Sequence, residues 1–207
     1  MERIILLGLV SCFLTFSANS VTAQPVSLSA VGLNRGVYFT ANELFLNQPT
    51  ESFQDCSKHQ CFSVSESGGN PVVRVRTEAN TIDYSAGKVF AFVDCYGRVF
   101  RFYDEGYYQI LEMGSITIYA KAQKIVNKGA TEMSTAYFFS ESITGELLPL
   151  EREKLMQVYS NHPDFANYVD KYFYPNVSLT AFNVQNGTYE ISRIFSDLVG
   201  NTLTALH

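Results

Sequence analysis

The sequence has no tryptophan and only three histidines, four cysteines and six prolines among its 207 residues. It also has no cluster of lysine and arginine residues, and its formal net charge is −5. A chain without a basic cluster cannot neutralise a row of phosphates, so we expect no nucleic-acid partner. No Gly-x-Ser-x-Gly elbow, phosphate-binding glycine loop or His-Glu-x-x-His helix is present, and we expect no cofactor and no bound metal.

What the chain does have is apolar and aromatic material. Hydrophobic residues make up 46% of it and charged residues 17%, with 13 tyrosines and 16 phenylalanines. This composition is far from that of disordered chains and is sufficient for a buried core. The length suits one domain.

The N-terminal residues resemble an export signal. The apolar stretch 4–16 is shorter than the ~20 residues that a membrane-spanning helix needs, and a polar spacer and the small residues 21–23 follow it. This anatomy predicts a signal peptide over residues 1–23, with cleavage between Ala23 and Gln24. We therefore expect a soluble protein, secreted or periplasmic, without a transmembrane segment in the mature chain.

A second interpretation of the leader is attachment to lipid. Residues 9–12 (LVSC) have the form of the box at which bacteria acylate a cysteine, here Cys12. Processing there would leave a short apolar stretch before the cut and the apolar residues 13–16 at the start of the mature chain. Cleavage after Ala23 uses the whole apolar stretch, and we favour it.

Three cysteines remain after the leader is removed. In an oxidising compartment Cys56 and Cys61 are expected to close a small disulfide, which would contribute roughly 2 kcal/mol for so short a ring. A soft-metal site that includes His59 is a second interpretation, although a fourth ligand is lacking, and two free thiols are a third. Cys95 is then expected to be unpaired, as a small buried hydrophobic residue.

The spacing of apolar residues predicts strands in the first two-thirds of the mature chain. Short turns with Asp and Gly separate four segments rich in β-branched and aromatic residues, which is typical of an antiparallel meander: 89–93, 99–103, 107–113 and 116–119. Shorter extended segments are expected at 36–39, 71–76 and 137–139, and the polar stretch 48–70 is expected to be a loop. Thr40, followed three residues later by Glu43, has the form of a capping box and predicts a short helix that ends before Pro49.

The last third of the chain has helical spacing. A helix is predicted over residues 151–159, a second from Pro163 with Phe165 and Val169 on its apolar face, and a third over 191–199 that stops at Gly200. Strands followed by helices indicate the α+β class, with C-terminal helices packed on the meander. We expect a single domain over 24–207, mainly β up to residue 145 and mainly helical from residue 146.

The concentration of tyrosines suggests a function. An aromatic sheet surface can bind a glycan, a peptide or a protein, and we expect a binding or structural module that uses such a surface. The alternative is that these tyrosines line the edge of the core, as half-buried tyrosines commonly do in strands. The candidate binding residues are Tyr96, Tyr103, Tyr107 and Tyr108.

The alternative to a binding or structural module is an enzyme. Asp94, Asp104 and Glu105 lie at two predicted hairpin turns, and paired carboxylates there would suit a secreted hydrolase acting on glycans. The same residues are also those that such turns require for their backbone geometry. We therefore assign no catalytic residue.

Three segments resemble a group of uncharacterised exported proteins of Bacteroidetes-type bacteria. The first is Gly36-Val37-Tyr38-x-Thr40 with Glu43, Phe45-Leu46 and Pro49, the second is Phe90-Ala91-Phe92-Val93-Asp94-x-x-Gly97 with Tyr107-Tyr108 and Gly114, and the third is Tyr137-Phe138-Phe139 with Thr144-Gly145-Glu146. The resemblance implies a secreted α+β protein and brings no assigned activity or site.

Overall fold

The computed structural model describes residues 32–52, 62–67, 70–76, 81–104, 106–127, 130–173 and 177–200. Its centre is an antiparallel sheet of eight strands, and most of the helices follow the sheet in the sequence, so the predicted α+β class is confirmed. In spatial order the strands are β11 (Leu148–Pro149), β10 (Ala130–Ser140), β9 (Thr117–Asn127), β8 (Gly106–Glu112), β7 (Val99–Tyr103), β6 (Ala91–Val93), β1 (Gly36–Tyr38) and β2 (Glu51–Ser52).

The pairing register assigns the side chains of this sheet to two faces. Phe92 of β6 lies opposite both Val37 of β1 and Phe100 of β7, and Phe100 lies opposite Gln109 of β8. Side chains of directly opposite residues share a face, and successive residues of a strand alternate between faces. We call the face with Phe92 the helical face, because helices cover part of it, and the opposite one the α1 face.

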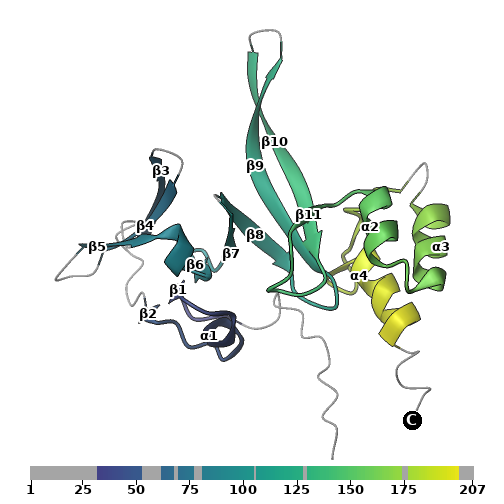
Figure 1. Ribbon diagram of the computed structural model, residues 1–207, viewed down its shortest axis with the longest axis horizontal. Helices are drawn as coiled ribbons and strands as arrows, with labels where there is room; N and C mark the ends of the chain where they lie inside the picture. Colours follow the sequence, from purple (N-terminus) through teal and green to yellow (C-terminus); the bar gives the residue numbers. More distant parts are fainter. Residues whose placement is uncertain are drawn as a thin grey trace, which may run out of the picture.

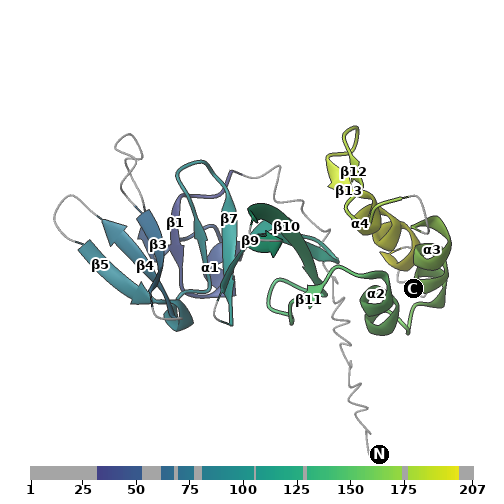
Figure 2. The same ribbon diagram turned by 90° about the horizontal axis from the view of Figure 1, so that it is seen from above.

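Three helices cover one end of the helical face (Figures 1 and 2): α2 (Arg152–Val158), α3 (Pro163–Tyr172) and α4 (Glu190–Phe195). A hairpin of β12 (Phe182–Asn183) and β13 (Thr188–Tyr189) leads into α4, which continues into a π-helical turn, Ser196–Gly200. The apolar side chains of the three helices form a core with the sheet that includes Ile116, Ile118, Phe139, Leu155, Phe165, Val169, Ile191, Ile194 and Phe195.

A second, smaller sheet covers the other end of the helical face (Figure 2). It consists of β3 (Phe62–Ser67), β4 (Asn70–Arg76) and β5 (Thr81–Ser85), and the 3-10 turn η2 (Ala86–Lys88) leads from it back to the large sheet. Val73 and Val75 of β4 share a buried cluster with Phe92 and Phe102. One face of the large sheet is therefore divided between a helical layer and a β layer.

The short helix α1 (Ala41–Phe45) packs on the α1 face. Thr40 caps it, because the Thr40 hydroxyl accepts a hydrogen bond from the backbone N–H of Glu43, and the Glu43 carboxylate accepts one from the backbone N–H of Thr40. The predicted capping box is thus confirmed. Leu44 of α1 is buried with Tyr38, Ile110 and other residues of this face.

Strands β9 and β10 form a long hairpin that rises beyond the rest of the sheet (Figure 1). They pair from Thr117 and Ser140 at the base to Asn127 and Ala130 at the far end. Strand β8 pairs with β9 only as far as Ala120, and within the described chain no other strand pairs with the distal part of β9. The sequence predicted only the basal segments 116–119 and 137–139, because the distal residues are mainly polar or small and most of those described are exposed, so they show no regular apolar alternation.

Several other local predictions are confirmed. The helix α3 begins at Pro163 and buries Phe165 and Val169, and Gly97 has the positive φ (+78°) expected at the turn between β6 and β7. The predicted loop 48–70 was wrong in two places, since both β2, which pairs with β1, and β3, which pairs with β4, lie within it. The β3 segment contains three serines and a glutamate, and its two apolar residues, Phe62 and Val64, give too short a pattern to indicate a strand.

One cysteine prediction is wrong. Cys95 is disulfide-bonded, whereas we expected an unpaired buried residue. It belongs to the turn after β6, where its side chain is only partly buried, so it is not part of the core. Cys12, Cys56, His59 and Cys61 lie outside the described residues, as do Ala23 and Gln24, so the predicted Cys56–Cys61 pair and the cleavage site stay predictions.

Candidate functional site

The four tyrosines predicted as binding residues do not form one surface. Tyr107 lies opposite Phe102 and packs against it on the helical face, with ring centroids 6.2 Å apart. Tyr108 lies opposite Arg101 and, like Tyr103, on the α1 face. Tyr96 is in the turn after β6 and is 74% exposed. The pairing register, which determines these faces, cannot be derived from the tyrosines themselves.

The tyrosines of the α1 face pack around a buried cation. Arg101 is only 4% exposed, and its guanidinium carbon is 5.0 Å from the ring centroid of Tyr103, 5.7 Å from that of Phe90 and 5.9 Å from that of Tyr119. Its Nη1 donates to the Tyr119 hydroxyl at 3.1 Å, and its Nε has no hydrogen-bond partner among the described residues. Within the described chain no carboxylate forms an ion pair with it. Aromatic faces therefore provide much of the environment of this charge.

Two of the carboxylates predicted for a hydrolase, Asp94 and Asp104, lie at opposite ends of β7. Asp94 is buried, and its two oxygens accept from the backbone N–H groups of Tyr96 and Arg98 and from the Arg98 side chain. Asp104 occupies a turn position with positive φ (+50°), and Glu105 lies outside the described residues. Asp94 is therefore engaged in shaping its own turn.

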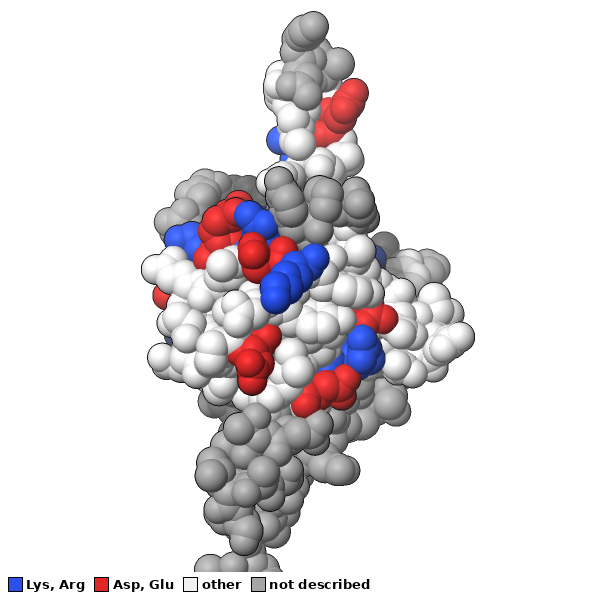
Figure 3. Space-filling model, turned by 90° about the vertical axis from the view of Figure 1, so that its right-hand side faces the viewer, with Lys and Arg blue, Asp and Glu red and all other residues white. Residues whose placement is uncertain are grey.

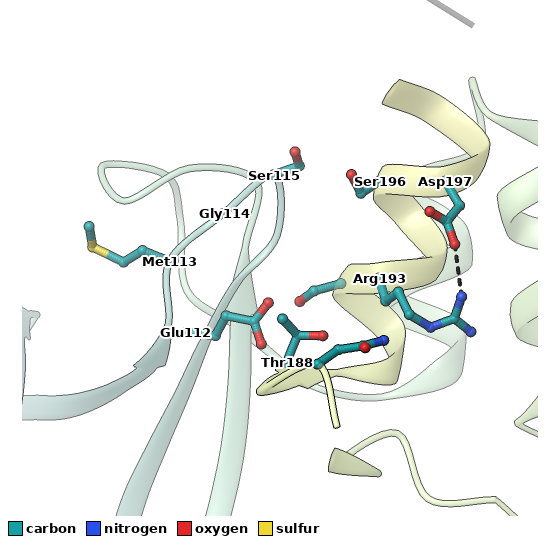
Figure 4. A pocket seen from close by; sticks show the side chains of 10 residues that line it. Glu112, Met113, Gly114, Ser115, Thr188, Arg193, Ser196 and Asp197 are labelled. Atoms are coloured by element: carbon teal, nitrogen blue, oxygen red, sulfur yellow. Dashed lines mark hydrogen bonds and ion pairs between the residues drawn. The ribbon is translucent and has the colours of Figure 1, made fainter. Parts of the chain in front are cut away.

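A polar cleft lies elsewhere, between the end of β8 and the start of α4 (Figure 4). Its volume is about 240 Å³, and two segments far apart in the sequence supply its walls. The strand end and the following turn contribute Glu112, Met113, Gly114 and Ser115, and the β13–α4 segment contributes Asn186, Thr188, Ser192, Arg193, Ser196 and Asp197.

Glu112 is the buried acid of this cleft. Tyr119 lies opposite Ile110, and the next residue of β9, Ile118, lies opposite Glu112, so β8 carries one extra residue, Leu111. Such a bulge re-aims side chains, and here it turns Glu112 to the helical face although Ile110, two residues earlier, belongs to the α1 face. The side chain is 6% exposed, and Figure 4 shows its carboxylate directed between the turn and α4.

Burial raises the pKa of Glu112 above its ordinary value of 4.5. Two neighbours act in the opposite direction: the backbone N–H of Tyr189, which donates to Oε2 at 2.7 Å, and the nearby side chain of Ser192. Burial therefore disfavours the charged form of this carboxyl, and the Tyr189 N–H and the Ser192 side chain only partly offset that effect.

Two hydroxyls of the same cleft have no partner. Thr188 Oγ1 and Ser192 Oγ are buried and form no hydrogen bond with any described residue, and the Ser192 residue is 8% exposed. Ser192 is close enough to influence the pKa of Glu112, yet its hydroxyl does not reach hydrogen-bonding geometry with it. A buried polar group without a partner costs about 1–3 kcal/mol. These two hydroxyls thus give the cleft hydrogen-bonding capacity that no described residue satisfies.

Ion pairs hold the outer wall of the cleft. Nη1 of Arg193 donates to Oδ2 of Asp197 at 2.8 Å, the contact drawn as a dashed line in Figure 4, and its Nε donates to Oε2 of Glu190 at 2.9 Å. These contacts raise the pKa of Arg193, with the hydrogen bond to Glu190 as the main cause. The guanidinium is therefore committed to two carboxylates and does not neutralise Glu112.

The surface around the helical layer carries charges of both signs. In Figure 3 basic and acidic side chains of the described residues lie side by side on this face, in keeping with ion pairs such as Arg152–Asp170 and Arg193–Asp197. Such intermixed charge gives no field of one sign to attract a polyanion to this face.

Two negative findings concern the described residues. No helix there is both long enough and apolar enough to span a membrane. No group of three or more His, Cys, Asp or Glu side chains there is arranged to hold a metal ion. Comparison of the chain with protein-family models, with curated proteins and with solved structures found no match.

The sequence did not indicate this cleft. Residues 191–199 were expected to be helical, which placed Ser192 on a helix, but no pattern signals a pairing of that helix with the end of β8. Glu112 ends an apolar strand segment, where a single acidic residue is ordinarily solvent-exposed. Only the bulge, which depends on pairing with β9, brings the two segments to one site.

Proposed function

We propose that this is an exported binding protein that holds a small polar ligand in the cleft between β8 and α4. One observation carries the proposal: a buried carboxyl and two buried hydroxyls without partners, those of Glu112, Thr188 and Ser192, line a single cavity. Unpartnered buried polar groups are few in native proteins, and ionisable groups with shifted pKa values concentrate at functional sites. A ligand that hydrogen-bonds to these groups would remove the free-energy cost of burying them without partners.

The lining favours binding over catalysis. The described residues of the cleft include serine and threonine hydroxyls, but no histidine or lysine that would act as a base to activate them. Its two carboxylates are not equivalent, because Asp197 is ion-paired with Arg193, whereas no cation among the described residues pairs with Glu112. The site therefore has acceptors and hydroxyls to orient a ligand.

A ligand panel tests this function. The purified protein would be screened by thermal unfolding against neutral polyols, small amines and small carboxylic acids. A ligand of the cleft should raise the unfolding temperature of the wild-type protein and should not do so in the double variant T188V/S192A. The matched control is T135V, on the exposed distal part of β10, which should respond as the wild type does. A panel without any binder, or a binder unaffected by the double variant, would contradict the proposal.

Export is the second part of the proposal, and it rests on the leader alone. Mass spectrometry of the protein recovered from its native host should show a mature chain that begins at Gln24 or its cyclised form. A mature chain that begins at an acylated Cys12 would instead show a lipid-tethered surface protein. The binding proposal survives either outcome, because the cleft lies far along the chain from both cleavage sites.

A further inference from the structure

The charge balance of the cleft indicates what kind of ligand fits it. The described lining contains two carboxylates, Glu112 and Asp197, and one guanidinium, Arg193. Arg193 pairs with Asp197 and also with Glu190, which lies behind the lining. Within the described chain no Lys, Arg or His side chain forms an ion pair with Glu112. The charge without a counter-charge in this cleft is therefore negative.

The free hydrogen-bonding positions are mainly acceptors. One oxygen of Glu112 accepts the N–H of Tyr189, which leaves further lone pairs of a group that has about four acceptor sites. Thr188 Oγ1 and Ser192 Oγ each add acceptor capacity, and neither has a hydrogen-bond partner among the described residues. An ammonium group has three donors and no acceptor, so one carboxylate oxygen and two hydroxyls match its requirements.

Resting on the proposed function, we infer that the ligand is a small hydroxylated primary amine, whose ammonium group binds to Glu112, Thr188 and Ser192. The other polar lining residues, Ser115, Asn186 and Ser196, are suited to its hydroxyl groups. The cavity of about 240 Å³ is below the usual range of roughly 300–1,000 Å³ for drug-sized ligands, which limits the ligand to about the size of an amino sugar.

Other ligand classes fit less well. A small anion would place its charge beside Glu112 without a free cation to balance it, and like charges brought together in a poorly solvated site repel strongly. A neutral polyol would satisfy the two hydroxyls but would leave the carboxylate buried without a counter-charge, and burying an unpaired charge is costly. An ammonium group supplies both the counter-charge for Glu112 and hydrogen-bond donors for the two hydroxyls.

A matched pair of probes tests the inference. Glucosamine and glucose differ at one position, where the first has an ammonium and the second a hydroxyl. Their dissociation constants would be measured by calorimetry in phosphate buffer free of amines. Because a hydrogen bond to a charged group contributes about 1.5–3 kcal/mol, we expect the wild-type protein to bind glucosamine about 10- to 100-fold more tightly than glucose.

Variants assign that preference to the cleft. E112Q keeps the shape and an acceptor but removes the charge, so it should bind the two sugars equally. The matched control is E146Q, an exposed carboxylate on the segment that packs against the α1 face, and it should keep the full preference. Should E112Q fail to fold, S192A takes its place, and its affinity for glucosamine should fall about 10-fold, as expected when one hydrogen bond is removed.

The possible results separate this inference from the binding function. Equal binding of glucose and glucosamine by the wild-type protein, or a preference that persists in E112Q, would overturn the amine inference and leave a polar binding site. Binding of carboxylic acids alone from the wider panel would do the same. If nothing in the panel binds, the function itself fails, and the inference fails with it.

Discussion

Two buried charged residues of the same sheet, Arg101 and Glu112, have opposite surroundings. Each is at most 6% exposed, and within the described chain neither forms an ion pair. Arg101, on the α1 face, is surrounded by aromatic rings and donates to the Tyr119 hydroxyl. Glu112, on the helical face, borders a cavity whose other polar groups are unsatisfied. The comparison teaches that burial of a charge does not by itself mark a functional site; what matters is whether the protein has filled the space around it.

The largest effect is expected from removing the cation of the α1 face. R101A leaves a cavity and removes the contacts with three rings and one hydrogen bond, and large-to-small changes of this kind destabilise by about 3 kcal/mol. R101M keeps most of the side-chain volume, so its free energy of unfolding should fall much less than that of R101A. Urea unfolding checks both, and the ligand affinity of the cleft should not change. Equal losses for the two variants would mean that charge, and not packing, dominates at this position.

The second effect concerns the pH dependence that Glu112 confers. Because burial raises its pKa above 4.5, the native state holds this proton more tightly than the unfolded state does. Stability therefore falls as the pH rises from the pKa of the unfolded state to the higher pKa of the folded state. E112Q lacks this penalty, so near neutral pH it should be more stable than the wild type by about 1 kcal/mol. At and below about pH 4 the difference should vanish, since the wild-type carboxyl is then protonated in both states.

Thermal unfolding of the two proteins between about pH 3.5 and 7.5 measures this difference. Curves that run parallel over the whole range would show that Glu112 does not titrate differently in the folded and unfolded states. A variant that is less stable than the wild type at neutral pH would show that the charged form is stabilised, in contradiction to the environment described here.

A smaller effect is expected at Thr188. T188V replaces a buried hydroxyl without a partner by a methyl group of the same shape, so the empty protein should gain up to about 1 kcal/mol while its ligand binds less tightly. A protein that becomes more stable and less functional at once is the behaviour expected of a binding site. Urea unfolding with and without glucosamine measures both quantities. A loss of stability in the empty protein would mean that the hydroxyl already has a partner, such as a bound water.

The smallest effect is expected where charges are exposed and paired. Arg74 and Asp83 form a two-point ion pair across β4 and β5, at 2.7 Å for each contact, and both side chains are nearly half exposed. Solvent screens such pairs, so D83N should leave the unfolding midpoint in urea almost unchanged. A clear destabilisation would show that the small sheet depends on this pair more than on Val73 and Val75.

Much of the fold was predictable because its signals are local. The capping box of Thr40 and Glu43, the Pro163 start of α3 and the glycine turn at Gly97 each depend on a few neighbouring residues. The apolar spacing of α3 likewise follows from its own segment. Such features are read from the sequence because the interactions that form them lie within one or two turns of chain.

The candidate site was not predictable because it depends on distant pairing. Glu112 reaches the cleft through a bulge that only its register with β9 defines, and Ser192 belongs to a segment about 80 positions later in the chain. The disulfide of Cys95 was missed for a similar reason, since proximity along the chain suggested a different pair. The aromatic residues that attracted attention in the sequence mostly contribute to packing, and among the four candidates Tyr96 is the most exposed.

The extra residue in β8 lets two neighbouring positions of the chain serve different purposes. Leu111 packs against the hydrophobic core beneath the helices, and Glu112, next to it, borders the cleft on the same side. In a strand of regular pleat, consecutive side chains would point in opposite directions, and only one of them could face α4. Natural variation is therefore free to repack the interior at Leu111 while the acid beside it stays in place, or to change the ligand chemistry without disturbing the interior.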